Sequence, residues 1–182
     1  KKIQAPEFKL DNHQVLALIA PRPFLLLGGD SADTDMAWAY IQAARPAYKL
    51  FDAEKNLAWW NHRLGHNYAP SVRKVAEEFL DWLDLPSSLR WLDVGCGTGA
   101  LTAAIWEKCR PAQLTGVDPS EGFLTKARTR LDGRAAFRVG NALYIPLRDA
   151  EVDVVVSGLV LNFVPSPALG LAQTSSTAVA GG

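Results

Sequence analysis

Short apolar runs alternate with amphipathic segments after Leu85-Pro86-Ser87-Ser88, and this alternation is the clearest pattern in the chain. Short apolar runs are typical of buried strands, whereas apolar residues that recur every three to four positions are typical of helices. We expect strands at residues 89–94, 113–117, 136–139 and 152–157, and helices at residues 100–108 and 121–131. Strict alternation of strand and helix predicts right-handed βαβ units, and hence an α/β fold with a mostly parallel sheet.

The pattern before residue 85 is less regular. We expect a buried strand at residues 22–29, a helix at 36–44, a strand at 47–51 and a loop through 59–66. Between Pro70 and Leu83 apolar residues recur with helical spacing, and proline suits the first turn of such a helix. The chain is therefore expected to divide into residues 1–84, residues 85–167 and a disordered tail at residues 168–182, where small residues have little to bury.

Composition limits the possible partners. With 182 residues, 48% of them apolar, and a formal net charge of zero, the chain has the composition of a soluble globular protein. The charges at residues 126–134 are interpreted as one solvated helix face, so no nucleic-acid partner is expected. The apolar segments 16–27 and 152–164 are shorter than the roughly 20 residues that cross a bilayer, so no membrane association is expected. Cys96 and Cys109 form no C-x-x-C pair, which favours a reducing, cytoplasmic compartment.

A glycine-rich turn follows the predicted strand 89–94 and opens directly into a helix. Gly95, Gly97 and Gly99 form a G-x-G-x-G pattern, which lets a ligand approach the backbone and suits a nucleotide. Turn amides and the helix N-terminus favour a carboxylate or phosphate. Asp118 ends the next strand, where a carboxylate can accept hydrogen bonds from ribose hydroxyls. The alternatives are a ligand-free βα connection for the turn and a surface carboxylate for Asp118.

Three motifs in order resemble class I S-adenosylmethionine-dependent methyltransferases over about residues 85–165. They are Leu92–Gly99, Gly116–Ser120, and Gly140-Asn141-Ala142 with Pro146-Leu147. The resemblance implies a Rossmann-like three-layer sandwich, S-adenosylmethionine as cofactor and a small-molecule methyl acceptor. The acceptor itself, the oligomeric state and a catalytic side chain are not readable from these residues, and no metal is expected.

The same resemblance implies roles for individual residues. Asp93 would meet the amino group of the ligand directly or through water, and Asp118 would hold the ribose. Asn141 stands where many members have an aspartate that binds the adenine amino group, and its amide oxygen can still accept that bond. The other implied cofactor contacts are Gly95, Cys96, Gly97, Gly99, Pro119 and Ala142.

Other residues in or near these motifs allow only a less specific interpretation. Cys96 is interpreted as a small filler, because no base lies near it in sequence. Asn162 and Phe163 occupy a region that often meets the acceptor in such enzymes, and core or turn roles stay open for them.

Residues 10–84 resemble the C-terminal end of an α/β-hydrolase of the dienelactone hydrolase or acetyl xylan esterase type. The resemblance rests on Ala20–Asp30, Asn61–His66 and a closing helix that ends Phe79-Leu80-Asp81. It implies Asp33, or else Asp30, as the triad acid and His66 as the base, with His62 structural. No G-x-S-x-G elbow occurs in the chain, so Asp33 and His66 are interpreted as remnants of a triad without its nucleophile.

The chain thus resembles a chimera of two incomplete α/β halves, and its first residue, Lys1, suggests a piece of something longer. A methyltransferase sheet normally has seven strands, and only the first four are expected here, which puts turnover in doubt. We hypothesise that strands 24–27 and 48–51 complete the sheet beside strand 152–157, which would otherwise present an open edge. The functions considered are a methyltransferase-like protein, an esterase fragment, and a hybrid fold without a selected activity.

Overall fold

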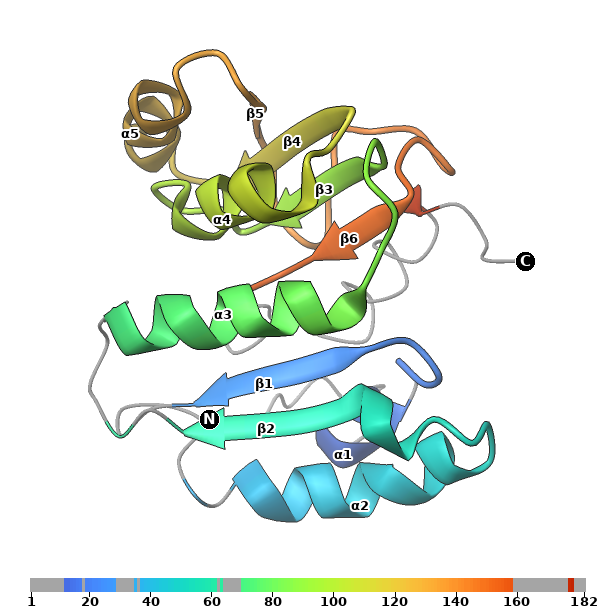
Figure 1. Ribbon diagram of the computed structural model, residues 1–182. Helices are drawn as coiled ribbons and strands as arrows, with labels where there is room; N and C mark the ends of the chain where they lie inside the picture. The colour runs from blue at the N-terminus through green and yellow to red at the C-terminus, as the bar shows by residue number, and fades with distance from the viewer. Residues whose placement is uncertain are drawn as a thin grey trace, which may run out of the picture. The chain divides into compact units, whose positions relative to one another are not determined.

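The computed structural model describes residues 12–17, 19–28, 35, 37–61, 63, 70–158 and 177–178, and it divides the chain into two units, residues 1–72 and 73–182 (Figure 1). Each unit has its own sheet and its own buried core.

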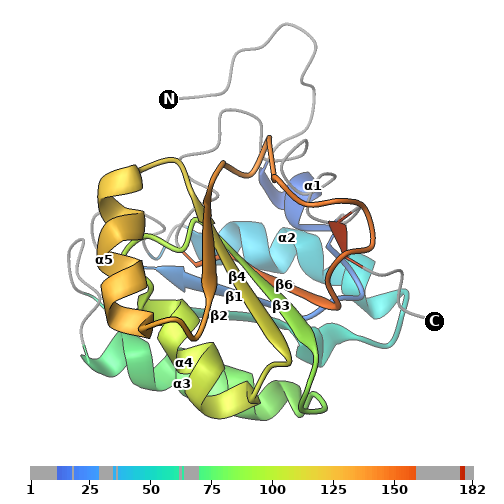
Figure 2. The ribbon, with the colours of Figure 1, turned by 90° about the horizontal axis from the view of Figure 1, so that it is seen from above.

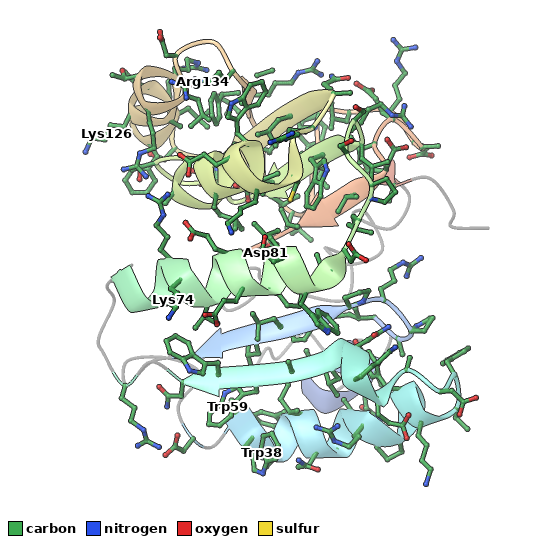
Figure 3. The ribbon with its side chains drawn as sticks, viewed as in Figure 1. Trp38, Trp59, Lys74, Asp81, Lys126 and Arg134 are labelled. Carbon is green, nitrogen blue, oxygen red and sulfur yellow. The ribbon has the colours of Figure 1, made fainter. Side chains whose placement is uncertain are left out.

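The first unit is built on one βαβ connection. Its elements are α1 (Asn12–Ala17), β1 (Phe24–Gly28), α2 (Ala37–Lys49), the 3₁₀ turn η1 (Glu54–Asn56) and β2 (Leu57–Asn61). β1 and β2 pair in parallel, from Phe24 opposite Leu57 to Gly28 opposite Asn61. Ile41, Ala44 and Tyr48 of α2 form the centre of the core. Trp38 and Trp59 pack with ring centroids 5.7 Å apart, and Figure 3 shows both on this unit.

The predicted strand at residues 47–51 is wrong. Residues up to Lys49 belong to α2, which continues through Pro46, and the second strand is instead β2, which ends inside the predicted loop. Proline inside a helix removes one backbone hydrogen bond, so it normally signals an end. Here Tyr48 is fully buried at helical spacing from Ile41 and Ala44, and this burial offsets the lost bond.

The second unit follows the predicted alternation. Its elements are α3 (Pro70–Leu83, which begins before the unit boundary), β3 (Arg90–Val94), α4 (Ala100–Cys109), β4 (Gln113–Asp118), α5 (Glu121–Leu131), β5 (Ala136–Val139) and β6 (Val154–Val156). All strands are parallel, in the order β5-β4-β3-β6, and Figure 2 shows α5 running beside β5. The prediction of an α/β fold with a mostly parallel sheet is therefore confirmed.

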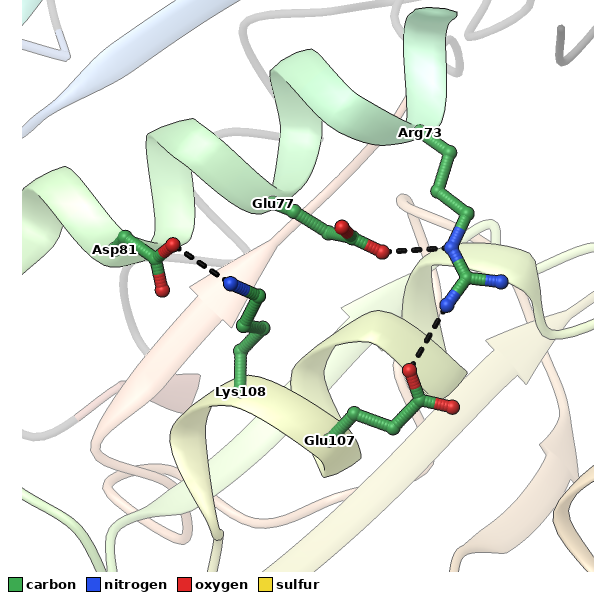
Figure 4. Close-up of polar contacts among 5 residues, drawn as sticks. All are labelled: Arg73, Glu77, Asp81, Glu107 and Lys108. Atoms are coloured by element: carbon green, nitrogen blue, oxygen red, sulfur yellow. Dashed lines mark hydrogen bonds and ion pairs between the residues drawn. The ribbon is translucent and has the colours of Figure 1, made fainter. Parts of the chain in front are cut away.

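Helices α3 and α4 cover one face of this sheet. Leu80 packs with Trp91, Ala104, Ile105 and Leu114, while a separate cluster around Leu92, Val94 and Val117 lies under the segment 142–152. Ion pairs join the two helices at their exposed side (Figure 4). Between the helices, Arg73 reaches Glu107 at 2.9 Å and Lys108 reaches Asp81 at 2.7 Å, while Arg73 also pairs with Glu77 within α3 at 2.6 Å.

The hypothesis of a hybrid sheet is wrong for the described residues. β1 and β2 form a two-stranded sheet with each other, while β6 pairs with β3 in the other sheet. On the approach to β6, Val152 bridges Ala178, and its N–H donates to the Thr177 carbonyl oxygen at 3.2 Å. The three valines of β6 are half-buried, with Val155 packed against one core cluster and Val154 and Val156 against the other.

Charge and hydropathy of the described elements also bear on the predicted partners. The exposed side of α5 carries the expected charges up to Arg130, and the remaining ones, Asp132 and Arg134, follow the helix; Figure 3 shows Lys126 on α5. Among the described residues, no helix is long and apolar enough to span a bilayer. Apart from residues 177–178, the predicted tail lies outside the described residues.

Candidate functional site

The glycine turn that follows β3 has a backbone that other residues rarely adopt. Gly95, Gly97 and Gly99 have φ angles of 74°, 54° and 78°, and Gly99 is the N-cap of α4. A Cβ added at Gly99 would lie 3.1 Å from the Cβ of Ala127 in α5, so this glycine allows close packing of the helix start. Among the described residues, no atom lies within 4 Å of a Cβ added at Gly97, which leaves open space above the middle of the turn.

Several amides of the turn are already used within the protein. The N–H groups of Gly95 and Cys96 donate to the Val117 carbonyl oxygen, at 2.7 and 3.1 Å, and Gly99 N–H donates to the Cys96 carbonyl oxygen at 2.9 Å. Gly97 N–H donates to Oδ2 of Asp118 at 3.0 Å. The expectation of an anion cradle therefore narrows to the first turn of α4, where the helix dipole still favours negative charge.

Asp118 braces the turn from the end of β4. In addition to Gly97, its carboxylate accepts from Ser120 N–H, 2.8 Å from Oδ1, and the side chain is 7% exposed. Ser120 in turn caps α5 by accepting from Phe123 N–H at 3.3 Å. Each carboxylate oxygen of Asp118 has a second lone pair, so the group retains the capacity to accept from a ligand.

Asp93 lies on β3 and is fully buried. Its side chain shares a sheet face with Trp91, which is the face that α4 covers, and Oγ1 of Thr102 donates to Oδ2 at 2.7 Å. Oδ1 is buried without a hydrogen-bond partner in the described structure. An unpartnered buried carboxylate oxygen is unfavourable, so a site beside it is suited to a donor, and best to a cation.

The electrostatics of the turn follow from this burial. Burial raises the pKa of Asp93 to about 7, and the nearby Asp118 charge adds to the rise, while the Thr102 hydrogen bonds oppose it. Burial also raises the pKa of the Cys96 thiol well above its ordinary value, with further contributions from Asp93 and Asp118. A thiol with a raised pKa is a poor nucleophile, which fits the interpretation of Cys96 as a filler.

Asn141 follows β5 and closes a tight turn. Its Oδ1 accepts from the N–H groups of Leu143, at 2.8 Å, and Tyr144, at 3.0 Å. The amide oxygen that we expect to meet adenine is therefore engaged by the backbone in this structure. Pro119 is exposed and follows Asp118, and Ala142 is buried in the cluster on the other sheet face.

The residues expected from the hydrolase resemblance, Asp30, Asp33, His62 and His66, lie outside the described residues, as do Asn162 and Phe163. The segments that leave β1 and β2 do meet at one described point. Nδ2 of Asn61 donates to Oδ1 of Asp35 at 3.0 Å, and Arg63 pairs with the same carboxylate at 3.2 Å.

Sequence reasoning missed Thr102. A usable signal existed, because Thr102 precedes Ile105 by one helical turn on the sheet-facing side of α4, where a polar residue needs a partner. Within the described residues, no group of three or more His, Cys, Asp or Glu side chains is placed to hold a metal ion.

Comparisons with known proteins show which family this part of the chain resembles. The profile of the family described as "Methyltransferase domain" matches residues 92–182. Trans-aconitate 2-methyltransferase of Variovorax paradoxus is 31% identical over 106 residues, which is 58% of this chain and 40% of that protein. Malonyl-[acyl-carrier protein] O-methyltransferase of Geobacter sulfurreducens is 39% identical over 95 residues, covering 50% of this chain and 35% of that protein. The chain thus spans at most about two fifths of either relative.

Solved structures share the fold. A putative S-adenosyl-L-methionine-dependent methyltransferase of Methanococcus maripaludis superposes with a TM-score of 0.56 at 22% identity, covering 63% of this chain and 54% of that one. An S-adenosylmethionine-dependent methyltransferase of Mesorhizobium loti gives 0.52 at 27% identity, with 59% and 50% covered.

Proposed function

Because the chain belongs to the Methyltransferase domain family, we propose that it binds S-adenosylmethionine at the glycine turn and serves methyl transfer to a small-molecule acceptor. The observation that carries this proposal is the pair of carboxylates at the ends of β3 and β4, one of them with a buried oxygen that lacks a donor. The methionine part of this cofactor brings an ammonium group, which is the kind of donor that such an oxygen needs.

The charge of the turn residues and the space above them support this cofactor. Open space over Gly97 accommodates a ligand close to the backbone, and Asp93 would receive the ammonium group. Asp118 would accept from the ribose hydroxyls with the lone pairs that the turn amides leave free. We also retain Gly95, Cys96, Gly99, Pro119, Asn141 and Ala142 as proposed contacts.

The chemistry that the cofactor supplies when bound is an activated methyl group on a sulfonium. The protein's task is then to position the acceptor in line and to exclude water, so no single catalytic side chain is required. The names of two relatives, trans-aconitate 2-methyltransferase and malonyl-[acyl-carrier protein] O-methyltransferase, make carboxylates the first acceptors to test, beginning with small free acids.

Calorimetric titration with S-adenosylhomocysteine tests the site with two matched glycine variants. Gly97 and Gly133 have positive φ angles of 54° and 78°, and an added Cβ meets nothing within 4 Å at either position. Gly97→Ala and Gly133→Ala therefore add similar backbone strain, but only the first adds a methyl group at the proposed site. We expect saturable binding for the natural sequence and for Gly133→Ala, and at least about tenfold weaker binding for Gly97→Ala.

Two results would contradict the proposal. One is the absence of binding heat with the natural sequence at any accessible concentration. The other is equal affinity of the two glycine variants, because the open space above Gly97 would then not be where the ligand lies.

We also propose that residues 10–84 derive from an α/β-hydrolase, and that the first region of the chain ends at residue 84. The parallel pairing of β1 with β2, and the contacts of Asp35 with Asn61 and Arg63, support it, because chain segments that follow both strands meet. Asp33 and His66 would then form an acid–base pair without a serine. A nuclear magnetic resonance titration should give His66 a pKa that falls in Asp33→Asn, and no change would exclude the pair.

A further inference from the structure

Thr102 places a hydroxyl where the fold alone would favour an apolar side chain. It lies in the first turn of α4, one helical turn before Ile105, and it is 0% exposed. A buried hydroxyl is unfavourable unless it is hydrogen-bonded, whereas a valine of the same shape would pack there without that requirement. The bond that satisfies this hydroxyl is the one to Oδ2 of Asp93, at 2.7 Å.

This bond treats the two oxygens of Asp93 differently. Oδ2 accepts a hydrogen bond from the Thr102 hydroxyl, while Oδ1 is also buried and has no hydrogen-bond partner among the described residues. The hydroxyl donor on one oxygen restricts rotation of the carboxylate about its Cβ–Cγ bond. The other oxygen is then held in one direction before any ligand arrives, which lowers the ordering cost of binding.

We propose that Thr102 is a positioning residue that holds the Asp93 carboxylate by Oδ2 and so presents Oδ1 to the ammonium group of the ligand. This inference rests on the proposed binding of S-adenosylmethionine and adds a specific role for a residue of α4. Thr102 does not touch the ligand in this arrangement but acts through Asp93.

The proposal has a consequence for the pH dependence of binding. The titratable groups that face Asp93 are Asp118, from the end of β4, and the Cys96 thiol of the turn, which stays neutral; α4 contributes Thr102. Loss of the Thr102 hydroxyl removes a contact that lowers the pKa of Asp93. The pKa of Asp93 should therefore rise further, and ligand binding, which needs the carboxylate, should require a higher pH.

Four variants separate positioning from packing. Thr102→Val removes the hydroxyl at constant shape, and Thr102→Ala replaces this variant if the valine protein does not fold. Thr102→Ser keeps the hydroxyl and loses only the methyl group. Thr115→Val is the control, because Thr115 is 1% exposed on β4 and also loses a buried hydroxyl. The readouts are carbon nuclear magnetic resonance of the Asp93 carboxyl in the free protein, and calorimetry with S-adenosylhomocysteine from pH 6 to pH 9.

We expect Thr102→Val to raise the pKa of Asp93 by about 1 and to weaken binding at pH 7 by about five- to tenfold, with a smaller difference at pH 8.5. Thr102→Ser and Thr115→Val should behave like the natural sequence. An unchanged pKa of Asp93 in Thr102→Val would overturn the inference, and so would a loss of affinity that is equal at every pH. If the natural sequence binds no ligand, the proposed function fails, and the inference fails with it even where the pKa of Asp93 rises.

Discussion

Asp93 and Asp118 stand on neighbouring parallel strands, yet the fold treats their carboxylates in opposite ways. Asp118 accepts from two backbone N–H groups, those of Gly97 and Ser120, so it holds together the turn that it borders. Asp93 is buried more deeply and has one hydroxyl donor, and one of its oxygens has no partner in the described part of the chain. The Asp118 carboxylate stabilises the folded chain, whereas burial of the Asp93 carboxylate without a full set of partners lowers the stability of the fold. Such an unfavourable group is typical of a functional site.

The strongest test of this contrast is removal of the favourable carboxylate. Asp118→Ala deletes the acceptor for both backbone amides as well as the proposed ribose contact. We expect about a 100-fold loss of affinity for S-adenosylhomocysteine, equal to about 2.7 kcal/mol, together with a lower melting temperature. Calorimetry and thermal unfolding measure the two effects.

Two companion variants make this result interpretable. Asp118→Asn keeps one acceptor oxygen for the turn, so it should fall between the alanine variant and the natural sequence in both measurements. Asp149→Ala removes an exposed carboxylate from the same unit and should change neither. Unchanged affinity in Asp118→Ala would leave Asp118 as a brace only.

Gly116 lies between the two carboxylates, because it is the register partner of Asp93 and comes two residues before Asp118. A Cβ at Gly116 would lie 2.6 Å from Cε1 of Phe137 and 2.9 Å from Sγ of Cys96. We expect Gly116→Ala to reduce the free energy of unfolding by about 2.5 kcal/mol, since a packed core resists added volume. Urea denaturation measures this change.

Gly122 is the matched control for this substitution. It lies within α5, where an added Cβ has only Ser120 Oγ nearby, at 3.9 Å. Gly122→Ala should therefore stabilise the protein by up to about 1 kcal/mol. If both variants were equally stable, the two strand ends would not be as closely packed as the distances indicate.

The second unit was easier to predict from the sequence than the first unit, and the reasons are physical. The alternation after residue 85 and the glycine turn are local patterns, so β3, α4, β4 and α5 were predicted within one residue of their observed ends. In the first unit, Pro46 suggested a helix end, but the burial of Tyr48 by distant residues overrode that local signal. The orphan oxygen of Asp93 depends on the packing of α4 over β3, which no local pattern contains. The two strand ends looked alike in sequence because their difference is one of burial and partners.

Replacing the unfavourable carboxylate should have the opposite effect on stability. The pKa of Asp93 is raised to about 7, above the ordinary value of aspartate in an unfolded chain. Folded protein therefore binds a proton that the unfolded chain releases between about pH 4 and pH 7, so the stability present below this window is lost as pH rises through it. Asp93→Asn does not titrate, and it should be about 2 kcal/mol more stable than the natural sequence at pH 8.

Asp153→Asn provides a control of opposite sign. The Arg90 guanidinium and backbone lower the pKa of Asp153 to about 2, so its contribution is present above the unfolded value and is lost as pH falls toward 2. This variant should be less stable than the natural sequence at pH 7. Denaturation at pH 4 and pH 8 distinguishes the two aspartates, and a stabilising effect of Asp93→Asn that is the same at both pH values would contradict the assignment.

The smallest expected effect concerns the residue that links Asp118 to α5. Ser120 donates its N–H to Asp118, and its hydroxyl oxygen accepts from Phe123 N–H at the start of the helix. Ser120→Ala keeps the first bond and loses the second, so it should reduce stability by about 1 kcal/mol and leave the affinity for S-adenosylhomocysteine within about twofold. A large loss of affinity in Ser120→Ala would show that the position of α5, and not only the Asp118 carboxylate, shapes the ligand site. The contrast between the two strand ends would then extend from two side chains to the helix that follows β4.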